Sequence, residues 1–402
     1  MTTYDDLAAL AGSHVMPTYG ARPIALSRGS GSTVWDSEGR SYLDLVAGIA
    51  VCSVGHSHPR VVAAAADQLG RLTHSSNLFL NEPSVRLAER LAGLIGRPAK
   101  SFFANSGAEA NEAAIKLVRK HGLSRAAGKV QIVATDGSFH GRTTGALAIT
   151  GQPAKRAPFG PLLSDVTFVP YGDEDALRAA VGPQTAGVVL EPIQGEIGVL
   201  VPPAGYLAAA REVTTRHDAL LVLDEVQTGV GRTGEWFAWQ GAGVLPDVMT
   251  LAKGLAGGLP IGVCMGFGPA GDVLTAGEHG STFGGNPVVC AAALAVLDVI
   301  EAEDLLTRAK VSGERLADGL AGAPGVASTR GAGLVRAMVL ASPVAKELEA
   351  AARDAGFLVN ALGADVVRLA PPLVITDEEI DRFVAAVPGM LDGLAPAAPA
   401  AG

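Results

Sequence analysis

ALLVLDEVQTG, residues 219–229, is a strand-like apolar run that ends in two carboxylates, Asp224 and Glu225. Further along, LAKGLAGGLP (251–260) carries no charge except the ammonium of Lys253. A buried ammonium without a partner is costly, so a lysine in such a run is expected to have a chemical use. Pyridoxal 5′-phosphate would use both groups, because its aldehyde needs an amine and its pyridinium nitrogen needs a carboxylate. The alternative is that the carboxylates cap a turn while the lysine reaches solvent.

Short apolar runs alternate with helical stretches between about residues 60 and 290. The runs are Ser101–Ala104, Val130–Ala134, Gly187–Leu190, Leu220–Leu223 and Asp247–Leu251. This alternation predicts an α/β fold with a mainly parallel sheet covered by helices. In such sheets ligands bind beyond the carboxyl ends of the strands, and most of the candidate site residues follow one of these runs.

The flanking segments predict a second, smaller α+β domain. The predicted elements are a hairpin at 33–45, helices at Val288–Ala302 and Asp304–Ala321, and strands near Gly333–Val339 and Val366–Leu369. We expect residues 1–59 to be the N-terminal segment of the small domain, 60–290 a large cofactor-binding domain, and 291–394 the C-terminal small domain. The Ala- and Pro-rich residues 395–402 are expected to form a flexible tail.

The composition is typical of a globular protein. Of 402 residues, 48% are hydrophobic and 18% are charged, which favours a sizeable core. The net charge of −9, without a basic stripe, argues against nucleic-acid binding. We expect no membrane span and no secretory signal, because the sequence lacks a long uninterrupted apolar run and its start lacks a basic region followed by an apolar one.

Cysteine and histidine positions argue against a disulfide or metal framework. Cys52, Cys264 and Cys290 lie far apart among apolar neighbours, as expected for buried free thiols in the reducing cytoplasm. The eight histidines do not cluster at metal-ligand spacing. We therefore expect no metal, and we expect His56 and His58 to be structural, without a carboxylate or cysteine partner.

NSGAEANE (105–112) is expected to open a helix directly after a strand. Ser106 and Glu109 have the spacing of a capping box. The glycine and alanine after Ser106 have little or no side chain, so an anion can approach the first helical amides, which makes a phosphate site. The alternative is an ordinary capped helix. In either case the helix is expected to run to about His121, with Gly122 ending it.

Three more loops hold candidate residues. FHGRT (139–143) offers Phe139 for stacking on a flat heterocycle and Arg142 for a substrate carboxylate, and the alternatives are core packing and a surface charge. EPIQGE (191–196) holds two carboxylates, and the spacing does not say which one faces a pocket. GSTFGGNP (280–287) is either a phosphate- or substrate-binding turn or a plain loop.

These stretches together resemble the class III pyridoxal-phosphate aminotransferases of fold type I, and above all the acetylornithine aminotransferases. The matching motifs are NSGAEANEAAIK (105–116), SFHGRT (138–143), EPIQGE (191–196), LLVLDEVQTGVGRTG (220–234), PDVMTLAKGLAGGLPIG (246–262), STFGGNP (281–287) and VVRLAPPL (366–373). With YLDLVAGIAVCSVGHSHP (42–59) and HSSNLFL (74–80) they cover nearly the whole chain in order. The resemblance implies a homodimer with shared active sites and a small domain built from the N- and C-terminal segments.

The resemblance also implies roles for individual residues. Lys253 would hold the cofactor aldehyde and later move a proton between cofactor and substrate, while Asp224 would pair with the pyridinium nitrogen. Expected around the cofactor are Phe139 and Val226 on the two ring faces, Gln227 beside the ring hydroxyl, Gly107 and Ala108 at the phosphate, and Thr282 reaching that phosphate from the second subunit. Glu225 is also expected among the cofactor-binding residues. Expected around the substrate are Ser281, Arg142 on the α-carboxylate, Glu196 and Arg368.

Glu196 and Arg368 suggest how one site accepts two substrates. With the amine donor bound, Glu196 would neutralise Arg368. With 2-oxoglutarate bound, the α-carboxylate of the keto acid would take Arg368 and Glu196 would swing out. Two positions depart from the family pattern, since Ile197 and Arg336 stand where relatives often carry glycine or another small residue.

The implied reaction is transamination of N2-acetylornithine with 2-oxoglutarate to N-acetylglutamate 5-semialdehyde and glutamate, in arginine biosynthesis and with ping-pong kinetics. The alternatives on the same fold are another ω-amine donor (ornithine, succinylornithine, N-succinyl-diaminopimelate or 4-aminobutyrate) and an aminomutase that needs no keto acid. A cofactor-binding regulator would need a DNA-binding segment, and a nicotinamide dehydrogenase would need G-x-G-x-x-G after a first strand. The sequence shows neither.

Overall fold

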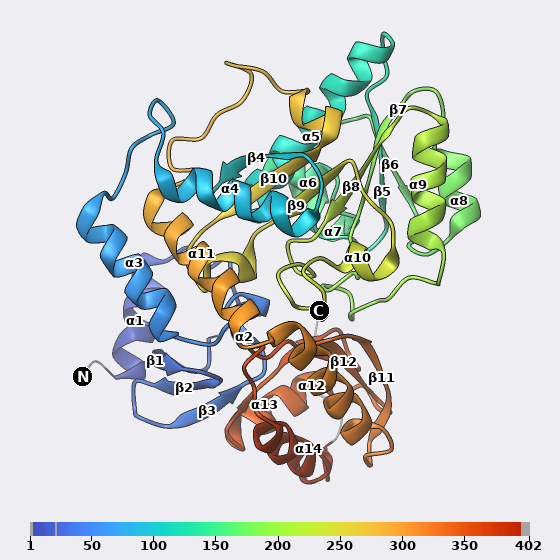
Figure 1. Ribbon diagram of the computed structural model, residues 1–402. Helices are drawn as coiled ribbons and strands as arrows, with labels where there is room; N and C mark the ends of the chain where they lie inside the picture. Colours follow the sequence, from blue (N-terminus) through green and yellow to red (C-terminus); the bar gives the residue numbers. More distant parts are fainter. Residues whose placement is uncertain (1–2, 21, 395–402) are drawn as a thin grey trace.

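The computed structural model describes residues 3–20 and 22–394, so the predicted tail lies outside the described residues. At its centre is a seven-stranded sheet in the order β4-β10-β9-β8-β7-β5-β6 (Figure 1). The strands are β4 (Ala99–Ala104), β5 (Gln131–Thr135), β6 (Val166–Val169), β7 (Thr185–Leu190), β8 (Leu220–Asp224), β9 (Val248–Leu251) and β10 (Gly262–Phe267). β5 to β9 are parallel, whereas β10 is antiparallel to both of its neighbours. The predicted mainly parallel sheet is confirmed.

The central strands are apolar along their whole length because helices cover the sheet. Every residue of β7, β8, β9 and β10 is buried. Helix α5 (Gly107–Arg125) packs against β7, β9 and β10, and α9 (Tyr206–Arg216) packs against β7 and β8. Helix α8 (Glu174–Ala180) lies outside them and packs on α9. Strands buried in this way give continuous apolar runs in the sequence, which is why the runs predict them.

The parallel strands end at one edge of the sheet, and this brings the candidate residues together. β5 ends shortly before Phe139, β7 ends directly before Glu191, β8 ends at Asp224, and β9 ends shortly before Lys253. Carboxyl ends of parallel strands are where ligands bind in sheets of this kind.

Helix α5 is longer than its sequence predicts. It continues to Arg125, so Gly122 lies inside the helix and does not end it. Gly122 is buried, and a Cβ at this position would collide with the backbone carbonyl of Lys129 and with the Ala186 side chain. The glycine is therefore there for close packing between α5 and the neighbouring chain.

The N- and C-terminal segments share a small sheet. β1 (Leu26–Ser30), β2 (Thr33–Asp36) and β3 (Ser41–Asp44) form an antiparallel meander that contains the predicted hairpin, and β13 (Phe357–Leu358) joins β3 in parallel. A third sheet has the order β11-β12-β15-β14, with α12 and α13 packed against it and α14 packed on these two helices (Figure 1). Its elements are α12 (Leu305–Leu320), β11 (Val326–Ala332), β12 (Val335–Leu340), α13 (Ala345–Asp354), β14 (Asn360–Leu362), β15 (Val366–Leu369) and α14 (Asp377–Leu391).

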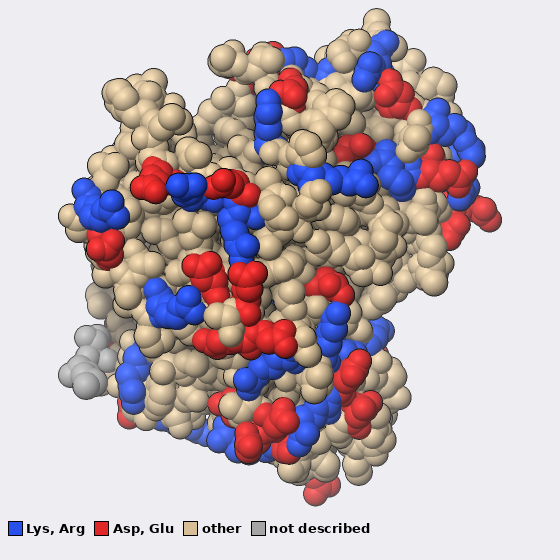
Figure 2. Space-filling model, in the orientation of Figure 1, with Lys and Arg blue, Asp and Glu red and all other residues tan. Residues whose placement is uncertain are grey.

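Helix α11 (Pro287–Ala302) packs along α3 (Pro59–Arg71) and α4 (Glu82–Ile95) (Figure 1). The remaining helical segments are α1 (Tyr4–His14), α2 (Ala47–Ala50), α6 (Thr144–Ala148), α7 (Pro153–Arg156), η1 (Ala157–Phe159), α10 (Ala238–Ala242), η2 (Lys253–Ala256) and η3 (Gly268–Asp272). None of the helices within the described ranges is both long and apolar enough to cross a membrane. On the face shown in Figure 2, acidic and basic side chains are interspersed.

Candidate active site

A cavity of about 450 Å³ lies at the carboxyl edge of the large sheet. Among the residues that line it are the predicted Gly107, Ala108, Phe139, Arg142, Glu196, Asp224, Val226, Gln227 and Lys253. Glu225, Ser281, Thr282 and Arg368 are not part of its lining. The fold thus gathers the predicted lining residues from five separate segments of the chain around one space.

Lys253 occupies a constrained position at the start of η2. Its φ is +34°, a backbone conformation that is costly for a residue with a side chain and that clusters at functional sites. Its amine forms no hydrogen bond or ion pair with any described residue. Burial lowers the pKa of Lys253 to about 8, although the charge of Glu196 partly offsets this effect. More of the amine is therefore neutral near neutral pH than in an ordinary lysine, and a neutral amine is what a nucleophile or a base requires.

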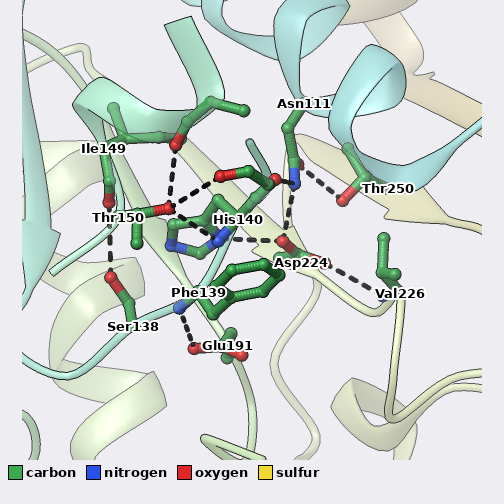
Figure 3. A network of polar contacts seen from close by, with 12 residues as sticks. Asn111, Ser138, Phe139, His140, Ile149, Thr150, Glu191, Asp224, Val226 and Thr250 are labelled. Atoms are coloured by element: carbon green, nitrogen blue, oxygen red, sulfur yellow. Dashed lines mark hydrogen bonds and ion pairs between the residues drawn. The ribbon is translucent and has the colours of Figure 1, made fainter. Parts of the chain in front are cut away.

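Asp224 is held by three hydrogen-bonding partners (Figure 3). Its Oδ2 accepts a hydrogen bond from Nδ2 of Asn111 (2.8 Å) and lies 2.7 Å from Nδ1 of His140. Its Oδ1 accepts from the backbone N–H of Val226 (3.0 Å). Asn111 is oriented in turn by Thr250, whose hydroxyl donates to the Asn111 side-chain oxygen (3.0 Å). This network fixes the orientation of the carboxylate at the cavity wall.

The N-terminus of α5 opens on the cavity. The hydroxyl of Ser106 accepts from the N–H of Glu109 (3.2 Å), as the spacing predicts. The reciprocal half of the capping box is absent, because the Glu109 carboxylate accepts instead from the backbone and side chain of Asn105 (2.7 and 2.8 Å). A Cβ on Gly107 would lie only 2.8 Å from the Val226 side chain, so glycine is required there. The first amides of α5, at the positive end of the helix, suit a phosphate.

The cavity walls suit a flat ring that carries a polar substituent. Phe139 and Val226 both line the space, and the Phe139 N–H donates to the Glu191 carboxylate (3.1 Å). Oε1 of Gln227 is buried and has no hydrogen-bond partner within the described residues. An unpaired buried acceptor is costly, so a ligand hydroxyl beside Gln227 would satisfy it. The amine, the carboxylate, the ring walls, this acceptor and the helix N-terminus together fit pyridoxal phosphate.

Both carboxylates of EPIQGE line the cavity, but their environments differ. Burial, reinforced by the negative charge of Asp224, raises the pKa of Glu191 well above its usual range. Glu196 accepts a hydrogen bond from Nη1 of Arg368 (2.7 Å). Burial raises the pKa of Glu196, but the charge and the hydrogen bond of Arg368 outweigh it and the net shift is downward. Burial thus favours the protonated form of Glu191, whereas Glu196 is an anion paired with a buried cation.

The Glu225 side chain does not line the cavity, and its cofactor-binding role stays a prediction. Its carboxylate lies on the side of the chain away from the cavity, where it accepts from the N–H of Trp239 (2.9 Å) and the hydroxyl of Thr228 (2.5 Å). Burial raises the pKa of Glu225 to about 7 even though these hydrogen bonds lower it. Successive side chains at a strand end point to opposite sides, so Asp224 and Glu225 face different sides of the chain. Glu225 anchors the loop that follows β8.

Ser281 and Thr282 lie close to the cavity without lining it. The Ser281 hydroxyl accepts from Nδ2 of Asn105, which does line the cavity (3.2 Å), and from the N–H of Gly284 (2.9 Å). Thr282 is exposed on its own chain. A role for Thr282 across a subunit boundary stays a prediction, as do the binding roles expected of the lining residues.

Sequence reasoning gives no role to two members of the Asp224 network, Asn111 and His140. Asn111 follows Gly107 by about one helical turn and therefore lies on the same side of α5. The helical periodicity of the sequence could thus have placed Asn111 at the site. His140 is fully buried next to Phe139, and its Nε2 has no partner among the described residues. No local pattern indicates its contact with Asp224.

The two departures from the family pattern have different settings. Ile197 is partly exposed and packs against Gly137 at the loop that precedes Phe139. Arg336 is half-buried and donates to the carbonyl oxygens of Gly333 (2.9 Å) and Gly331 (3.2 Å). Arg336 therefore closes the turn between β11 and β12.

His56 has a carboxylate partner, contrary to the prediction. Its Nε2 lies 2.7 Å from Oδ2 of Asp44, and this hydrogen bond, followed by one with Cys52, raises the pKa of His56 to about 10. His58 also lies within ion-pair distance of Glu303 (3.4 Å). These histidines tie the loop after α2 to its surroundings. In the part of the chain that the structure describes, no three His, Cys, Asp or Glu side chains are grouped so that they could hold a metal ion.

Known proteins resemble the chain over almost its full length. The family described as aminotransferase class III matches residues 15–391. An acetylornithine aminotransferase from Mycolicibacterium smegmatis is 58% identical over 94% of this chain and 96% of its own length. The ornithine aminotransferase from Toxoplasma gondii, in a structure described with partial occupancy of PLP at its active site, is 35% identical with a TM-score of 0.92 over 97% of this chain and 94% of that one. An N-acetylornithine aminotransferase from Stenotrophomonas maltophilia is 36% identical with a TM-score of 0.83, covering 95% and 98%.

Proposed function

Because the chain belongs to the class III aminotransferases, we propose that it transfers the δ-amino group of N2-acetylornithine to 2-oxoglutarate. The products are N-acetylglutamate 5-semialdehyde and glutamate, which places the enzyme in arginine biosynthesis. The observation that carries the proposal is the cavity in which a partner-free lysine amine, a fixed aspartate and a helix N-terminus meet. The choice of substrate is supported by the Mycolicibacterium relative, which has the name of this activity and matches along nearly the whole chain.

Pyridoxal phosphate is the cofactor of the proposed reaction, in line with the Toxoplasma structure. When bound, it supplies an electron sink for the carbon that exchanges its amino group, and it carries that group from donor to acceptor. Lys253 would hold the aldehyde and Asp224 the pyridine nitrogen. Phe139 and Val226 would cover the ring, and the first amides of α5 would hold the phosphate.

Lys253 would also move the proton at the reacting carbon. With its pKa lowered to about 8, the amine can accept a proton and return it near neutral pH. The donor, having given up its amino group, must leave the cavity before the keto acid enters, so the two substrates occupy the same space in turn. Ping-pong kinetics are therefore expected.

The pairing of Glu196 with Arg368 supports the exchange expected at the substrate site. Arg368 is buried, with 2% of its surface exposed, and it donates to Glu196 (2.7 Å) and to Asn360 (2.7 Å). While Glu196 is paired with Arg368, the positive charge of the arginine is neutralised. A donor that has no carboxylate next to its reacting carbon can then bind. When 2-oxoglutarate binds, its α-carboxylate would replace Glu196 on Arg368.

A homodimer with shared sites is part of the proposal. The loop between α3 and α4 projects from the molecule (Figure 1) and exposes Leu78, Phe79 and Leu80 by 85%, 71% and 90%. Phe283, next to Thr282, is exposed by 60%. Exposed apolar side chains of this kind mark contact surfaces, so a second copy of the chain would cover them and bring Thr282 to the neighbouring cofactor. Leu80→Asp should then yield a monomer in sedimentation and lower activity, and an unchanged dimer would contradict this surface.

The cellular location and the domain division are also part of the proposal. The cysteines are free thiols, and Cys264 and Cys290 are buried, which supports a location in the cytoplasm. The division into a large domain of residues 60–290 and a small domain from both ends of the chain is supported by the pairing of β13 with β3.

Ornithine is the alternative donor that a specific observation favours, because the Toxoplasma ornithine aminotransferase shares the fold with a TM-score of 0.92. The deciding experiment compares kcat/KM for N2-acetylornithine, N2-succinylornithine, ornithine, N-succinyl-diaminopimelate and 4-aminobutyrate with 2-oxoglutarate as acceptor. A clear preference for acetylornithine is expected. If another donor is preferred, the proposed transamination stands but acetylornithine is not its substrate. Turnover without any keto acid would point to an aminomutase.

A further inference from the structure

Two cations beside the cavity have no acidic partner. Neither Arg142, which lines the cavity, nor Lys155 of α7 forms a hydrogen bond from its side chain or an ion pair with any described residue. Both lie over the same aromatic ring: the Arg142 Cζ is 5.7 Å and the Lys155 Nζ is 4.8 Å from the centre of Phe139. Arg368 is different, because its guanidinium is already paired with Glu196.

The position of Lys155 is fixed by the structure around α7. Gln152, directly before α7, donates from its side chain to the carbonyl oxygens of Gly137 (3.1 Å) and Ser138 (3.3 Å). The backbone N–H of Lys155 donates to the Gln152 carbonyl (3.0 Å). The turn that carries Lys155 is thus tied to the residues immediately before Phe139. The ammonium is held at the ring and does not extend freely into solvent.

Lys155 is also part of the electrostatics of the cavity. Burial lowers its pKa, and the largest opposing influence is the negative charge of Glu196, followed by a lowering influence of the positive charge of Arg142. The charges of Arg142 and Lys155 thus act on each other, and both cations lie over Phe139. A half-buried ammonium without a counter-ion is costly, which indicates that an anion belongs beside it.

Both proposed substrates carry such an anion. In N2-acetylornithine the α-carboxylate is several bonds away from the δ-amino group that reacts. In 2-oxoglutarate the second carboxylate is similarly remote from the keto carbon. A carboxylate has two oxygens and can accept from two cationic donors at once, so a single two-cation subsite could serve both substrates. The Phe139 ring lies next to both cations, and an apolar ring there limits water and strengthens the attraction.

We propose that Lys155 is a specificity-determining residue that acts with Arg142 to hold the carboxylate remote from the reacting carbon in both substrates. The inference rests on the proposed function for the identity of the donor. It assigns Lys155 to recognition of the substrate and not to the proton transfer at the reacting carbon.

Matched substrates and variants of the holoenzyme test this assignment. Lys155→Met removes the charge but keeps the aliphatic stem over Phe139, and Lys155→Arg keeps the charge. Lys346→Met, at an exposed position in α13, controls for the loss of one positive charge. Each variant is assayed with 2-oxoglutarate and with 2-oxopentanoate, in which a methyl group replaces the distal carboxylate. The donors compared are N2-acetylornithine and N-acetylputrescine, which lacks the α-carboxylate. Where turnover is slow, the inhibition constant of the analogue replaces kcat/KM.

We expect Lys155→Met to lower kcat/KM by about tenfold for acetylornithine and 2-oxoglutarate, which have the remote carboxylate, mainly by raising KM. For the two analogues without it, kcat/KM should change by less than about twofold. Lys155→Arg should restore most of the loss, and Lys346→Met should have no effect. Equal losses with and without the carboxylate, or no loss at all, would overturn the proposal. The comparison of 2-oxoglutarate with 2-oxopentanoate requires only aminotransferase activity with some amine donor. It therefore still tests the role of Lys155 if acetylornithine proves not to be the donor.

Discussion

Nδ1 of His140 lies 2.7 Å from Oδ2 of Asp224, with both side chains almost completely buried. The histidine comes from the loop after β5 and the aspartate from the end of β8, so the contact joins two strands that are not neighbours in the sheet. Asn111 reaches the same carboxylate oxygen from α5. The group expected to control the cofactor ring is thus oriented by three separate parts of the chain.

Asn111→Ala should weaken catalysis without unfolding the protein. The substitution removes the donor to Asp224 and a donor to the His140 carbonyl, and hydrogen bonds to charged groups contribute about 1.5 to 3 kcal/mol each. We expect kcat/KM to fall by about 10- to 100-fold and pyridoxal phosphate to bind more weakly in a titration followed by visible absorbance. An unaltered rate and affinity would show that the other two partners suffice to hold Asp224.

Lys253→Ala should abolish turnover. Its amine is the only lysine amine that lines the cavity among the described residues, and a positioned base contributes about 10²- to 10⁴-fold to proton transfer. We expect kcat to fall by at least about a thousandfold while circular dichroism and the melting temperature indicate an intact fold. Residual activity near the wild-type level would remove Lys253 from the mechanism.

Glu196→Ala should change which donors are accepted. Without Glu196 the buried Arg368 has lost its acidic partner, so a donor with a carboxylate next to its amine can bind to the guanidinium. We expect the ratio of kcat/KM for glutamate to that for acetylornithine to rise by about tenfold or more. Glu314→Ala, at an exposed position in α12, serves as the matched control. A ratio that stays constant in Glu196→Ala would rule out the exchange.

Glu225 makes stability depend on pH in a defined direction. Its pKa is raised from 4.5 to about 7 in the folded protein, so between these values the folded state binds more protons than the unfolded state. The free energy of unfolding gains a contribution below pH 4.5 that is lost as the pH rises to about 7. Glu225→Gln should therefore remove on the order of 1 to 3 kcal/mol of this pH dependence. Urea unfolding of both proteins across this range provides the measurement, and parallel curves would contradict the prediction.

Gly122→Ala and Gly93→Ala should have opposite effects although both glycines lie inside helices. A Cβ at Gly122 would collide with the Lys129 carbonyl, whereas nothing lies within 4 Å of the corresponding atom at Gly93. We expect Gly122→Ala to destabilise the protein by about 1 to 3 kcal/mol and Gly93→Ala to stabilise it by about 0.5 to 1 kcal/mol. Equilibrium unfolding of the two variants checks this, and effects of the same sign would refute it.

The central sheet and the position of the site can be predicted because each depends on local runs. Buried strands such as β8 give unbroken apolar stretches, and topology alone brings the carboxyl ends of parallel strands to the edge of the sheet where the site lies. Asp224 and Lys253 follow from this reasoning. The short strand β13 has only two residues and is not predicted, since a pairing of that length has no periodicity to detect.

The features that the sequence did not predict correctly all depend on contacts between distant segments of the chain. Glu225 follows Asp224 directly, and only the pleat at the end of β8 decides that one faces the cavity and the other the loop to Trp239. The prediction that Gly122 ends α5 is wrong because the clash that requires glycine there involves Lys129, beyond the end of the helix. His56 meets Asp44 across a loop. Each outcome is set by a contact between segments, which spacing along the chain does not contain.

The pairing of β13 with β3 also sets an order of events during synthesis. The N–H groups of Leu43 and Leu45 donate to the carbonyl oxygens of Gly356 and Leu358, which leave the ribosome long after β3 has emerged. Until then the edge of β3 is an open template on which another nascent chain could pair. All residues that line the cavity are translated before β13 emerges. The N-terminal meander therefore lacks its fourth strand at a time when the whole cavity lining has already been synthesised.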